Sequence, residues 1–242
     1  MTPICRFERI ETKYLITEEQ KNRLLLRAAG RVTPDSYGRS RIANVYFDTP
    51  DHRIIRRSLE KPVYKEKLRL RSYGTPAGEG ATVFLELKKK YRGVVYKRRE
   101  PMTYADAISF LARPVPTTQI EREIARTLAF YPELSPAMYL SYLREAFFGV
   151  CDAGLRLTFD TDIRYREEDA ELSRGVCGRE LLSRDFVLLE IKAEGNFLLW
   201  LSKILSEEKI FHTSFSKYGR AYETICKEKM TKYRNMEGTC YA

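Results

Sequence analysis

The sequence predicts an α+β fold in which a closed antiparallel β-barrel of about eight strands forms a cationic tunnel flanked by helices. Three observations lead to this expectation. The 242 residues are 43% hydrophobic and 12% aromatic, which is enough for one substantial core and excludes a wholly disordered chain. Many segments alternate polar and apolar residues with a period of two. Their polar positions are dominated by Lys and Arg. We find no linker or repeat, so we expect one domain over residues 1–242.

The first part of the chain is expected to be mainly extended. Thr17 and Gln20 have the capping-box spacing that opens a short helix after the first strand. Arg92 and Gly93 are suited to a tight hairpin turn between the last two strands of this part. The expected strands cover residues 6–16, 41–48, 63–73, 81–90 and 93–101.

Helices and strands both follow. Residues 103–112 and 118–131 are expected to be helical, and Thr118 precedes Glu121 at the capping-box spacing. Trp200 belongs to an apolar helical stripe that we expect to pack outside the barrel. The remaining expected elements are strands at 138–148, 154–165 and 185–194 and helices at 197–207 and 216–232.

The polar residues of each expected strand share one face, because successive side chains of a strand point to opposite sides. Lys67, Arg69 and Arg71 lie on one face of their strand, with Leu68 and Leu70 on the other. A solvated sheet face is the simplest interpretation of any single strand. Across seven strands, however, enclosed cations without partners would cost several kcal/mol each. We therefore expect an anion to fill a closed, cationic lumen.

Composition narrows the function classes further. The 43 Lys and Arg residues against 33 Asp and Glu give a net charge of +10, which favours a polyanionic partner. The only two histidines, His52 and His212, leave little room for histidine-based chemistry. The five cysteines form no CxxC pair and are expected to be reduced thiols of a cytoplasmic protein. The sequence has no expected membrane span or signal peptide, and no GxxxxGK, GxGxxG, HExxH or GxSxG motif.

Several short motifs occur in a fixed order along the chain. They are Arg9-x-Glu11-x-Lys13-Tyr14, Tyr46-Phe47-Asp48-Thr49, Lys67-Leu68-Arg69-Leu70-Arg71, Glu86-Leu87-Lys88, Tyr142-Leu143-Arg144, Arg156-Leu157-Thr158-Phe159-Asp160, Leu189-Glu190-Ile191-Lys192 and Ser214-Phe215-Ser216-Lys217-Tyr218. This ordered set resembles the triphosphate tunnel metalloenzymes. Within them it is most similar to the vacuolar transporter chaperone (VTC) catalytic domain, which synthesises inorganic polyphosphate. The resemblance is collinear from about residue 5 to residue 225.

The resemblance implies a metal-dependent phosphotransferase that moves the terminal phosphoryl group of a nucleoside triphosphate, with ATP as the expected donor, to a growing polyphosphate chain. It implies catalytic phosphate ligands at Lys13, Arg69, Arg71, Lys88, Arg144 and Arg156. Further substrate contacts are implied at Arg9, Lys97, Tyr142, Lys192, Ser216 and Lys217. Glu190 would bind Mn²⁺ or Mg²⁺. Because the sequence contains no evident membrane anchor, translocation of the product would require a separate membrane protein partner at the cytoplasmic face.

Two departures from the superfamily pattern affect this interpretation. The superfamily usually opens with Glu-x-Glu-x-Lys, but Arg9 occupies the first position here, which argues against a two-metal triphosphatase. Ser214 stands where the last motif often has a lysine.

Several roles stay open at this point. Glu11 and Glu86 are either further metal ligands or partners of the tunnel cations, and we favour the second role. Glu190 alternatively forms a structural ion pair near Lys192, and Ser216 with Lys217 alternatively caps a helix.

Three other functions are compatible with parts of the sequence. A tunnel hydrolase would cleave tripolyphosphate or a nucleoside triphosphate, and a non-catalytic module would only bind polyphosphate. A nucleic-acid binder would use the basic and aromatic residues of 88–92 and 96–99. The alternation of basic residues over many strands argues against this last alternative, so no nucleic acid is expected as a partner.

Overall fold

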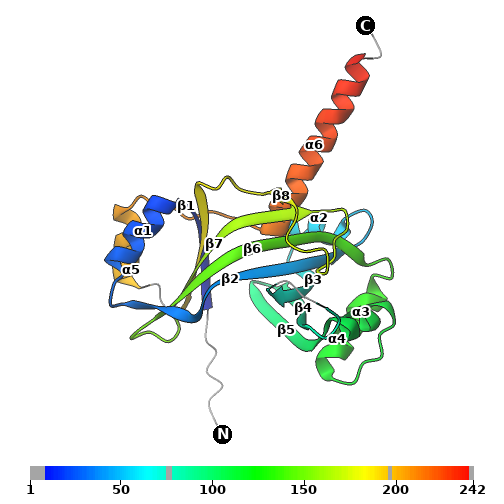
Figure 1. Ribbon diagram of the computed structural model, residues 1–242, viewed down its shortest axis with the longest axis horizontal. Coiled ribbons are helices and arrows are strands. Elements are labelled where there is room, and N and C mark those ends of the chain that lie inside the picture. Colours follow the sequence, from blue (N-terminus) through cyan, green and yellow to red (C-terminus); the bar gives the residue numbers. More distant parts are fainter. Residues whose placement is uncertain (1–8, 75–77, 196–197, 240–242) are drawn as a thin grey trace. The chain divides into compact units, whose positions relative to one another are not determined.

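The computed structural model describes residues 9–74, 78–195 and 198–239, and these residues form an α+β structure (Figure 1). The strands are β1 (Arg9–Thr17), β2 (Val32–Asp48), β3 (Tyr64–Tyr73), β4 (Thr82–Tyr91), β5 (Val94–Thr103), β6 (Ser135–Gly149), β7 (Arg156–Arg166), β8 (Arg179–Glu180) and β9 (Phe186–Glu194). The helices are α1 (Glu18–Arg27), α2 (Arg53–Leu59), α3 (Tyr104–Ala112), α4 (Gln119–Phe130), α5 (Leu199–Glu207) and α6 (Lys217–Thr239). Residues 6–8 of the first expected strand lie outside the described part.

The strands form one sheet in the order β1-β9-β7-β6-β2-β3-β4-β5, with β8 attached to β7. Among the described residues, β1 pairs only with β9 and β5 only with β4, so the sheet is not closed. The expectation of a closed barrel was therefore wrong. It assumed cations without partners, whereas Glu86, Asp160 and Glu190 form ion pairs with cations on the polar strand faces. These carboxylates stabilise the charged faces without closure of the sheet.

The chain divides into two compact units. The first comprises Met1–Arg41, Tyr142–Ile163 and Leu182–Phe215, and the second comprises Ile42–Ser141, Arg164–Leu181 and Ser216–Ala242. Strands β2, β6 and β7 contribute residues to both units. The single domain expected over residues 1–242 stays a prediction.

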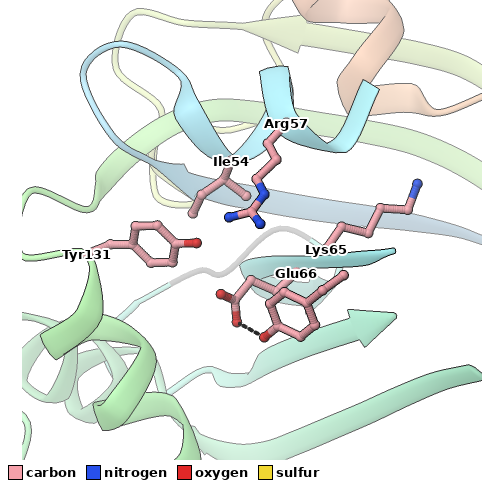
Figure 2. Close-up of a pocket in the computed structure, with 6 residues that line it drawn as sticks. Ile54, Arg57, Lys65, Glu66 and Tyr131 are labelled. Atoms are coloured by element: carbon pink, nitrogen blue, oxygen red, sulfur yellow. Dashed lines mark hydrogen bonds between the residues drawn. The ribbon is translucent and has the colours of Figure 1, made fainter. Parts of the chain in front are cut away.

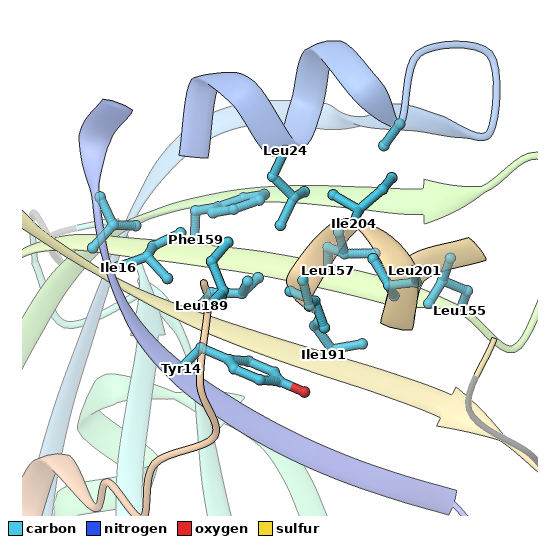
Figure 3. Close-up of a cluster of buried hydrophobic side chains, with 14 residues drawn as sticks. Tyr14, Ile16, Leu24, Leu155, Leu157, Phe159, Leu189, Ile191, Leu201 and Ile204 are labelled. Carbon is cyan, nitrogen blue, oxygen red and sulfur yellow. The ribbon is translucent and has the colours of Figure 1, made fainter. Parts of the chain in front are cut away.

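The core of the first unit lies between one sheet face and helices α1 and α5. Figure 3 shows Leu157, Phe159 and Leu189 of the strands beside Leu24 of α1 and Leu201 of α5. All five side chains are buried. Trp200 packs against this cluster from its edge, and the guanidinium of Arg31 lies 5.1 Å from the Trp200 ring. The polar residues of the same strands therefore lie on the face away from the helices.

The second unit repeats this arrangement with α3 and α4, which lie beside β4 and β5 in Figure 1. Leu68 and Leu70 of β3 and Leu85 of β4 are buried together with Phe110 of α3 and Ile124 of α4. The expected alternation is confirmed: apolar strand residues face the helices, and most Lys and Arg residues of β3, β4 and β5 face the opposite side, with Lys89 and Arg98 as exceptions.

The local signals for helix starts and for the hairpin are confirmed. The Thr17 hydroxyl accepts a hydrogen bond from the Gln20 backbone N–H, and the Gln20 side chain accepts one from Thr17, which is the expected capping box. Thr118 and Glu121 form the same pair at α4. Positive φ angles at Arg92 (45°) and Gly93 (86°) form the expected turn between β4 and β5.

Helix α2 was not expected because its cap is distant in sequence. The Asp48 carboxylate accepts hydrogen bonds from the backbone N–H groups of Ile54 (2.8 Å) and Ile55 (2.9 Å). The residue directly before the helix, His52, adopts a left-handed conformation and makes no side-chain cap. The Asp48 carboxylate, six residues before Ile54, thus caps the start of α2. Sequence patterns instead identify a cap at the residue directly before a helix.

Helix α6 is anchored at its start. The Tyr218 hydroxyl donates to the buried Asp48 carboxylate at 2.8 Å, so Asp48 holds both α2 and α6. The described helices include none with the length and apolar character required for a membrane span.

Candidate functional site

The second unit places Arg and Lys side chains of β3 and β5 around one carboxylate of β4, the strand between them. In the antiparallel register, Arg69 of β3 and Arg99 of β5 both lie opposite Glu86 of β4. Arg71 and Lys97 lie near the same carboxylate. We call Glu86 with Arg69, Arg71, Lys97 and Arg99 the Glu86 cluster.

Glu86 is the centre of this cluster and is only 1% exposed. Its carboxylate accepts hydrogen bonds at 2.7 Å from Nε of Arg69 and from Nε of Arg99. Lys97 Nζ lies 3.1 Å and Arg71 Nε 3.8 Å from it. Burial alone would raise the pKa of Glu86, but the charges of Arg69, Arg71 and Lys97 outweigh it and hold the pKa well below its usual range. This geometry favours the role of Glu86 as a partner of the cations.

Two further side chains hold the arginines of the cluster. Asn44 Oδ1 accepts a 2.9 Å hydrogen bond from Nε of the buried Arg71. The Tyr46 hydroxyl accepts one from Arg69 at 3.0 Å. Burial acts to raise the pKa of Tyr46, but the charges of Arg69, Arg71 and Lys67 lower it to about 8. A phenol with this pKa reports a strongly positive potential at the cluster.

Lys88, Ser216 and Lys217 were also predicted to contact phosphate. Lys88 lies opposite both Lys67 and Lys97 in the sheet and is exposed. Ser216 Oγ accepts a hydrogen bond from the Gly219 backbone N–H at 3.2 Å, which is the bond of a helix cap, and one from Lys67 Nζ at 3.3 Å. Lys217 is the first residue of α6. The alternative interpretation of Ser216 as a cap thus agrees with its geometry.

The first unit has a second group of charges, around Glu190 of β9. Glu190 Oε1 lies 2.7 Å from Lys192 Nζ, and its other oxygen lies 3.9 Å from Lys13 Nζ. Lys13 also lies 3.7 Å from Glu11 Oε1 and donates to the Phe215 backbone carbonyl at 3.0 Å. We call Glu11, Lys13, Glu190 and Lys192 the Glu190 cluster. The alternative ion pair of Glu190 is therefore present.

Arg144 is held by a residue that sequence analysis did not select. Its guanidinium donates to both carboxylate oxygens of Asp160, at 2.6 and 2.7 Å, and lies 5.1 Å from the Tyr142 ring. Asp160 is fully buried. Burial acts to lower the pKa of Arg144, but Tyr142 and Asp160 outweigh it and raise the pKa well above its usual value. The motif that contains Arg156 includes Asp160 on the same strand face, which was the available signal.

Arg156 and Arg9 lie apart from these contacts. Arg156 pairs with Asp35 at 3.6 Å and lies 4.9 Å from the Phe148 ring, while its backbone is opposite Lys192 in the sheet. Arg9 begins β1, where its backbone lies opposite Glu194. The structure thus brings Lys13, Glu190 and Lys192 together, and it gives Arg156 a different partner.

The carboxylates of the Glu190 cluster suit a divalent metal ion that takes most of its ligands from substrate phosphates and water. The described residues contain no group of three His, Cys, Asp or Glu side chains placed to bind a metal. Mg²⁺ usually needs only one or two protein carboxylates, because it takes its other ligands from substrate phosphates and water. Glu190 with Glu11 would provide such a set. The three described cysteines, Cys151, Cys177 and Cys226, are free thiols outside the two clusters.

A small pocket in the second unit has a different character (Figure 2). It is lined by Ile54, Arg57, Tyr64, Lys65, Glu66 and Tyr131. The Tyr64 hydroxyl donates to Glu66 Oε2 at 2.9 Å. Burial and the neighbouring Glu66 raise the pKa of both Tyr64 and Tyr131. A buried carboxylate in contact with neutral phenols does not suit a phosphate ligand, so we place the candidate site at the two charged clusters.

Solved structures with a similar fold support this description. A protein of Bacillus halodurans, proposed to be an adenylate cyclase, matches with a TM-score of 0.52 and 17% identity over 86% of this chain and 93% of its own. The PH1819 protein of Pyrococcus horikoshii matches with a TM-score of 0.50 and 13% identity over 90% of this chain and 99% of its own. At these identities the likeness concerns the fold. No curated protein matches the chain by sequence.

The family model of the VTC domain matches residues 8–226, which include both clusters and every motif of the ordered set described above. The chain therefore belongs to the VTC domain family.

Proposed function

We propose that the chain is a metal-dependent polyphosphate polymerase that transfers the γ-phosphoryl group of ATP to the end of an inorganic polyphosphate chain. The observation that carries this proposal is the Glu86 cluster, in which four cations of β3 and β5 surround a single buried carboxylate of β4. The cluster therefore keeps a net positive charge, and it lies at motif positions of the VTC family.

Phosphoryl transfer requires mainly positioning and charge neutralisation from the protein. In the proposed step, the bond between the γ-phosphorus and the β–γ bridging oxygen breaks, and ADP leaves with that oxygen and its electron pair. A terminal oxygen of the polyphosphate chain forms the new bond to the γ-phosphorus. Both substrates are polyanions, so guanidinium and ammonium groups are well suited to hold them.

Within the second unit, Arg69, Arg71, Lys88 and Lys97 are proposed to hold phosphate groups, and Glu86 positions the two arginines and Lys97 for this role. The Tyr46 phenol and the Asn44 amide restrict the orientation of Arg69 and Arg71. Ser216 and Lys217 are proposed as further contacts at the start of α6.

Within the first unit, Glu190 with Glu11 is proposed to hold Mn²⁺ or Mg²⁺, which when bound would neutralise charge on phosphate oxygens. Lys13 and Lys192 would bind phosphate beside these carboxylates. Asp160 fixes the orientation of Arg144. The remaining proposed phosphate contacts of this unit are Arg9, Tyr142, Arg144 and Arg156.

A separate membrane protein partner and a cytoplasmic location remain parts of this proposal. Both are implied by the resemblance to the VTC family.

The proposal is tested by incubating the purified protein with ATP and Mn²⁺ and measuring ADP, free phosphate and acid-stable polymer. We expect ADP together with polymer, and loss of both in Lys88→Ala and Glu190→Gln. Lys89→Gln, on the opposite face of β4, is the matched control and should retain activity. Free phosphate without polymer would assign the chain to the hydrolases of the superfamily. Equal activity of Lys88→Ala and Lys89→Gln would contradict the proposed face.

A further inference from the structure

Lysines lie directly opposite one another on the face that holds Glu86. The register pairs Lys65 of β3 with Lys90 of β4, and Lys88 of β4 with both Lys67 and Lys97. Because residues two apart on a strand share a face, Lys88 and Lys90 continue the line of Glu86 toward the hairpin turn at Arg92 and Gly93.

Such pairs are unfavourable, since opposite positions in antiparallel strands place Cβ atoms about 4.5–5.5 Å apart and like charges there destabilise the sheet. In the described part of the chain, no carboxylate lies within ion-pair distance of Lys65, Lys88 or Lys90. Burial lowers the pKa of Lys65, and the charges of Lys90, Lys61 and Lys88 lower it further. The three lysines therefore form a concentration of positive charge without internal compensation.

The nearest carboxylate along the chain does not compensate them. Glu66 is adjacent to Lys65 but accepts the Tyr64 hydroxyl hydrogen bond on the other face of β3. Figure 2 shows the Lys65 ammonium directed away from the Glu66 carboxylate. Lys65 Nζ instead donates to the Ser58 backbone carbonyl, at 3.3 Å.

We propose that Lys65, Lys88 and Lys90 form a subsite that holds linear polyphosphate beyond the Glu86 cluster, and we call it the lysine row. This inference deepens the proposed function and rests on it. Along β4, Lys90 at the far end of the row lies about 13 Å from Glu86, because a strand rises about 3.3 Å per residue. Phosphates held there are additional to those at the Glu86 cluster, so the row distinguishes a long chain from a triphosphate.

Linear polyphosphate fits the row better than single-stranded nucleic acid does. Proteins that bind single strands interleave basic residues with aromatic rings on which the bases stack. Here Tyr91 and Tyr96 belong to the opposite face of the hairpin from Lys88 and Lys90, because they alternate with them along β4 and β5. On the face of the row itself, the rings of Tyr46 and Tyr73 lie against Arg69 and Arg71 of the Glu86 cluster rather than beside Lys65, Lys88 and Lys90. The row thus offers charge in place of alternating stacking rings.

The test compares two probes, inorganic tripolyphosphate and long-chain inorganic polyphosphate, by calorimetric titration at one ionic strength. The variant is Lys65→Gln/Lys90→Gln in the full chain. We expect its affinity for long chains to fall about tenfold, equivalent to about 1.4 kcal/mol. Its affinity for tripolyphosphate should change by less than about twofold, which is small on the same scale. Its melting temperature should not fall, because the substitution removes like-charge contacts.

Lys89→Gln/Arg92→Asn is the matched control, since it removes the same number of positive charges from the same end of β4 at positions outside the row. The subsite would be overturned if this control lost as much long-chain affinity as the row variant. It would also be overturned if the row variant lost affinity equally for both probes, or lost none. Tighter binding of an oligonucleotide than of polyphosphate by the row would also overturn it. If the wild-type chain binds neither probe, the proposed function fails together with the row. Unchanged binding in the row variant alone refutes only the subsite.

Discussion

Replacement of Glu86 by Gln removes the one negative charge of the Glu86 cluster while preserving the shape of the side chain. Arg69 and Arg99 each donate to this carboxylate at 2.7 Å, and Lys97 lies 3.1 Å away. An amide at this position can accept from only one side, and its NH₂ group would face guanidinium donors. The variant therefore removes the carboxylate that these close cations share.

The expected loss of stability follows from this geometry. Removing one partner of a buried ion pair typically costs about 3–5 kcal/mol. Glu86 is 1% exposed, but the Lys97 side chain is 47% exposed and water compensates part of its charge. We therefore expect a loss near the lower limit, about 3 kcal/mol. For a chain of this length the melting temperature should fall by roughly 6–12 °C.

Urea denaturation of the wild type and Glu86→Gln at pH 7 measures this loss. Glu123→Gln is the matched control, because Glu123 pairs with Arg98 on the other side of β5 and is partly exposed. The control should lose less than about 1 kcal/mol. Equal stability of Glu86→Gln and the wild type would refute the central role of Glu86.

The pH dependence of the same difference provides a second check. The folded-state pKa of Glu86 is lowered, so its contribution is fully present above the unfolded-state value of about 4.3 and is lost as the pH falls through the folded-state value. The wild type should therefore lose its advantage over Glu86→Gln in acid. A difference that stays constant from pH 7 to about pH 3 would contradict this linkage.

Three further outcomes follow from the two clusters. The Tyr46 phenol should titrate near pH 8, measured by ultraviolet absorbance, and this transition should disappear in Tyr46→Phe. If the first tyrosinate transition occurs only near pH 10, the positive potential that we assign to the cluster is contradicted. Arg71→Ala should lower the free energy of unfolding, because Arg71 is buried and bonded to Asn44. Lys88→Ala should leave the free energy of unfolding unchanged or raise it, because Lys88 lies opposite other lysines. Urea denaturation measures both variants, and equal losses would show that Lys88 is also a structural partner. Asp160→Asn should lower the free energy of unfolding by about 3–5 kcal/mol, because it removes the carboxylate that holds the enclosed Arg144. The double variant Asp160→Asn/Arg144→Met should recover part of this loss in the same measurement. Additive losses from the two substitutions would contradict the pair.

The strand faces could be predicted from the sequence because alternation is a local property. The positions of Arg69 and Arg71 relative to Leu68 and Leu70 follow from a period of two and from the burial of leucine. The start of α1 and the turn at Gly93 were predictable for the same reason, since a few adjacent residues determine each of them.

The partners of the cations depend on register between strands, which alternation does not determine. The contact of Glu86 with Arg99 follows from the short turn between β4 and β5, but its contact with Arg69 requires the register of β3 across a longer connection. The pairing of Arg144 with Asp160 likewise joins separate strands. Without these partners the polar faces had to be treated as uncompensated, which led to the incorrect expectation of a closed barrel.

The same limitation affected the segment after β2. Asp48 caps α2 and anchors Tyr218 of α6 by contacts of long sequence separation, and no local pattern indicates them. The incomplete prediction of β2, which begins at Val32 rather than near residue 41, has a related origin, because its first half is mostly exposed and lacks apolar alternation.

The most direct measurement of the central claim follows the γ-phosphoryl group itself. The wild-type chain is incubated with Mn²⁺ and ATP labelled at the γ-phosphate, and the label is separated into orthophosphate and acid-stable polymer. The polymerase proposed here should place the label in polymer, with one ADP formed for each phosphate incorporated. Recovery of the label as orthophosphate, with no polymer at any time, would contradict the proposal and identify the chain as a hydrolase.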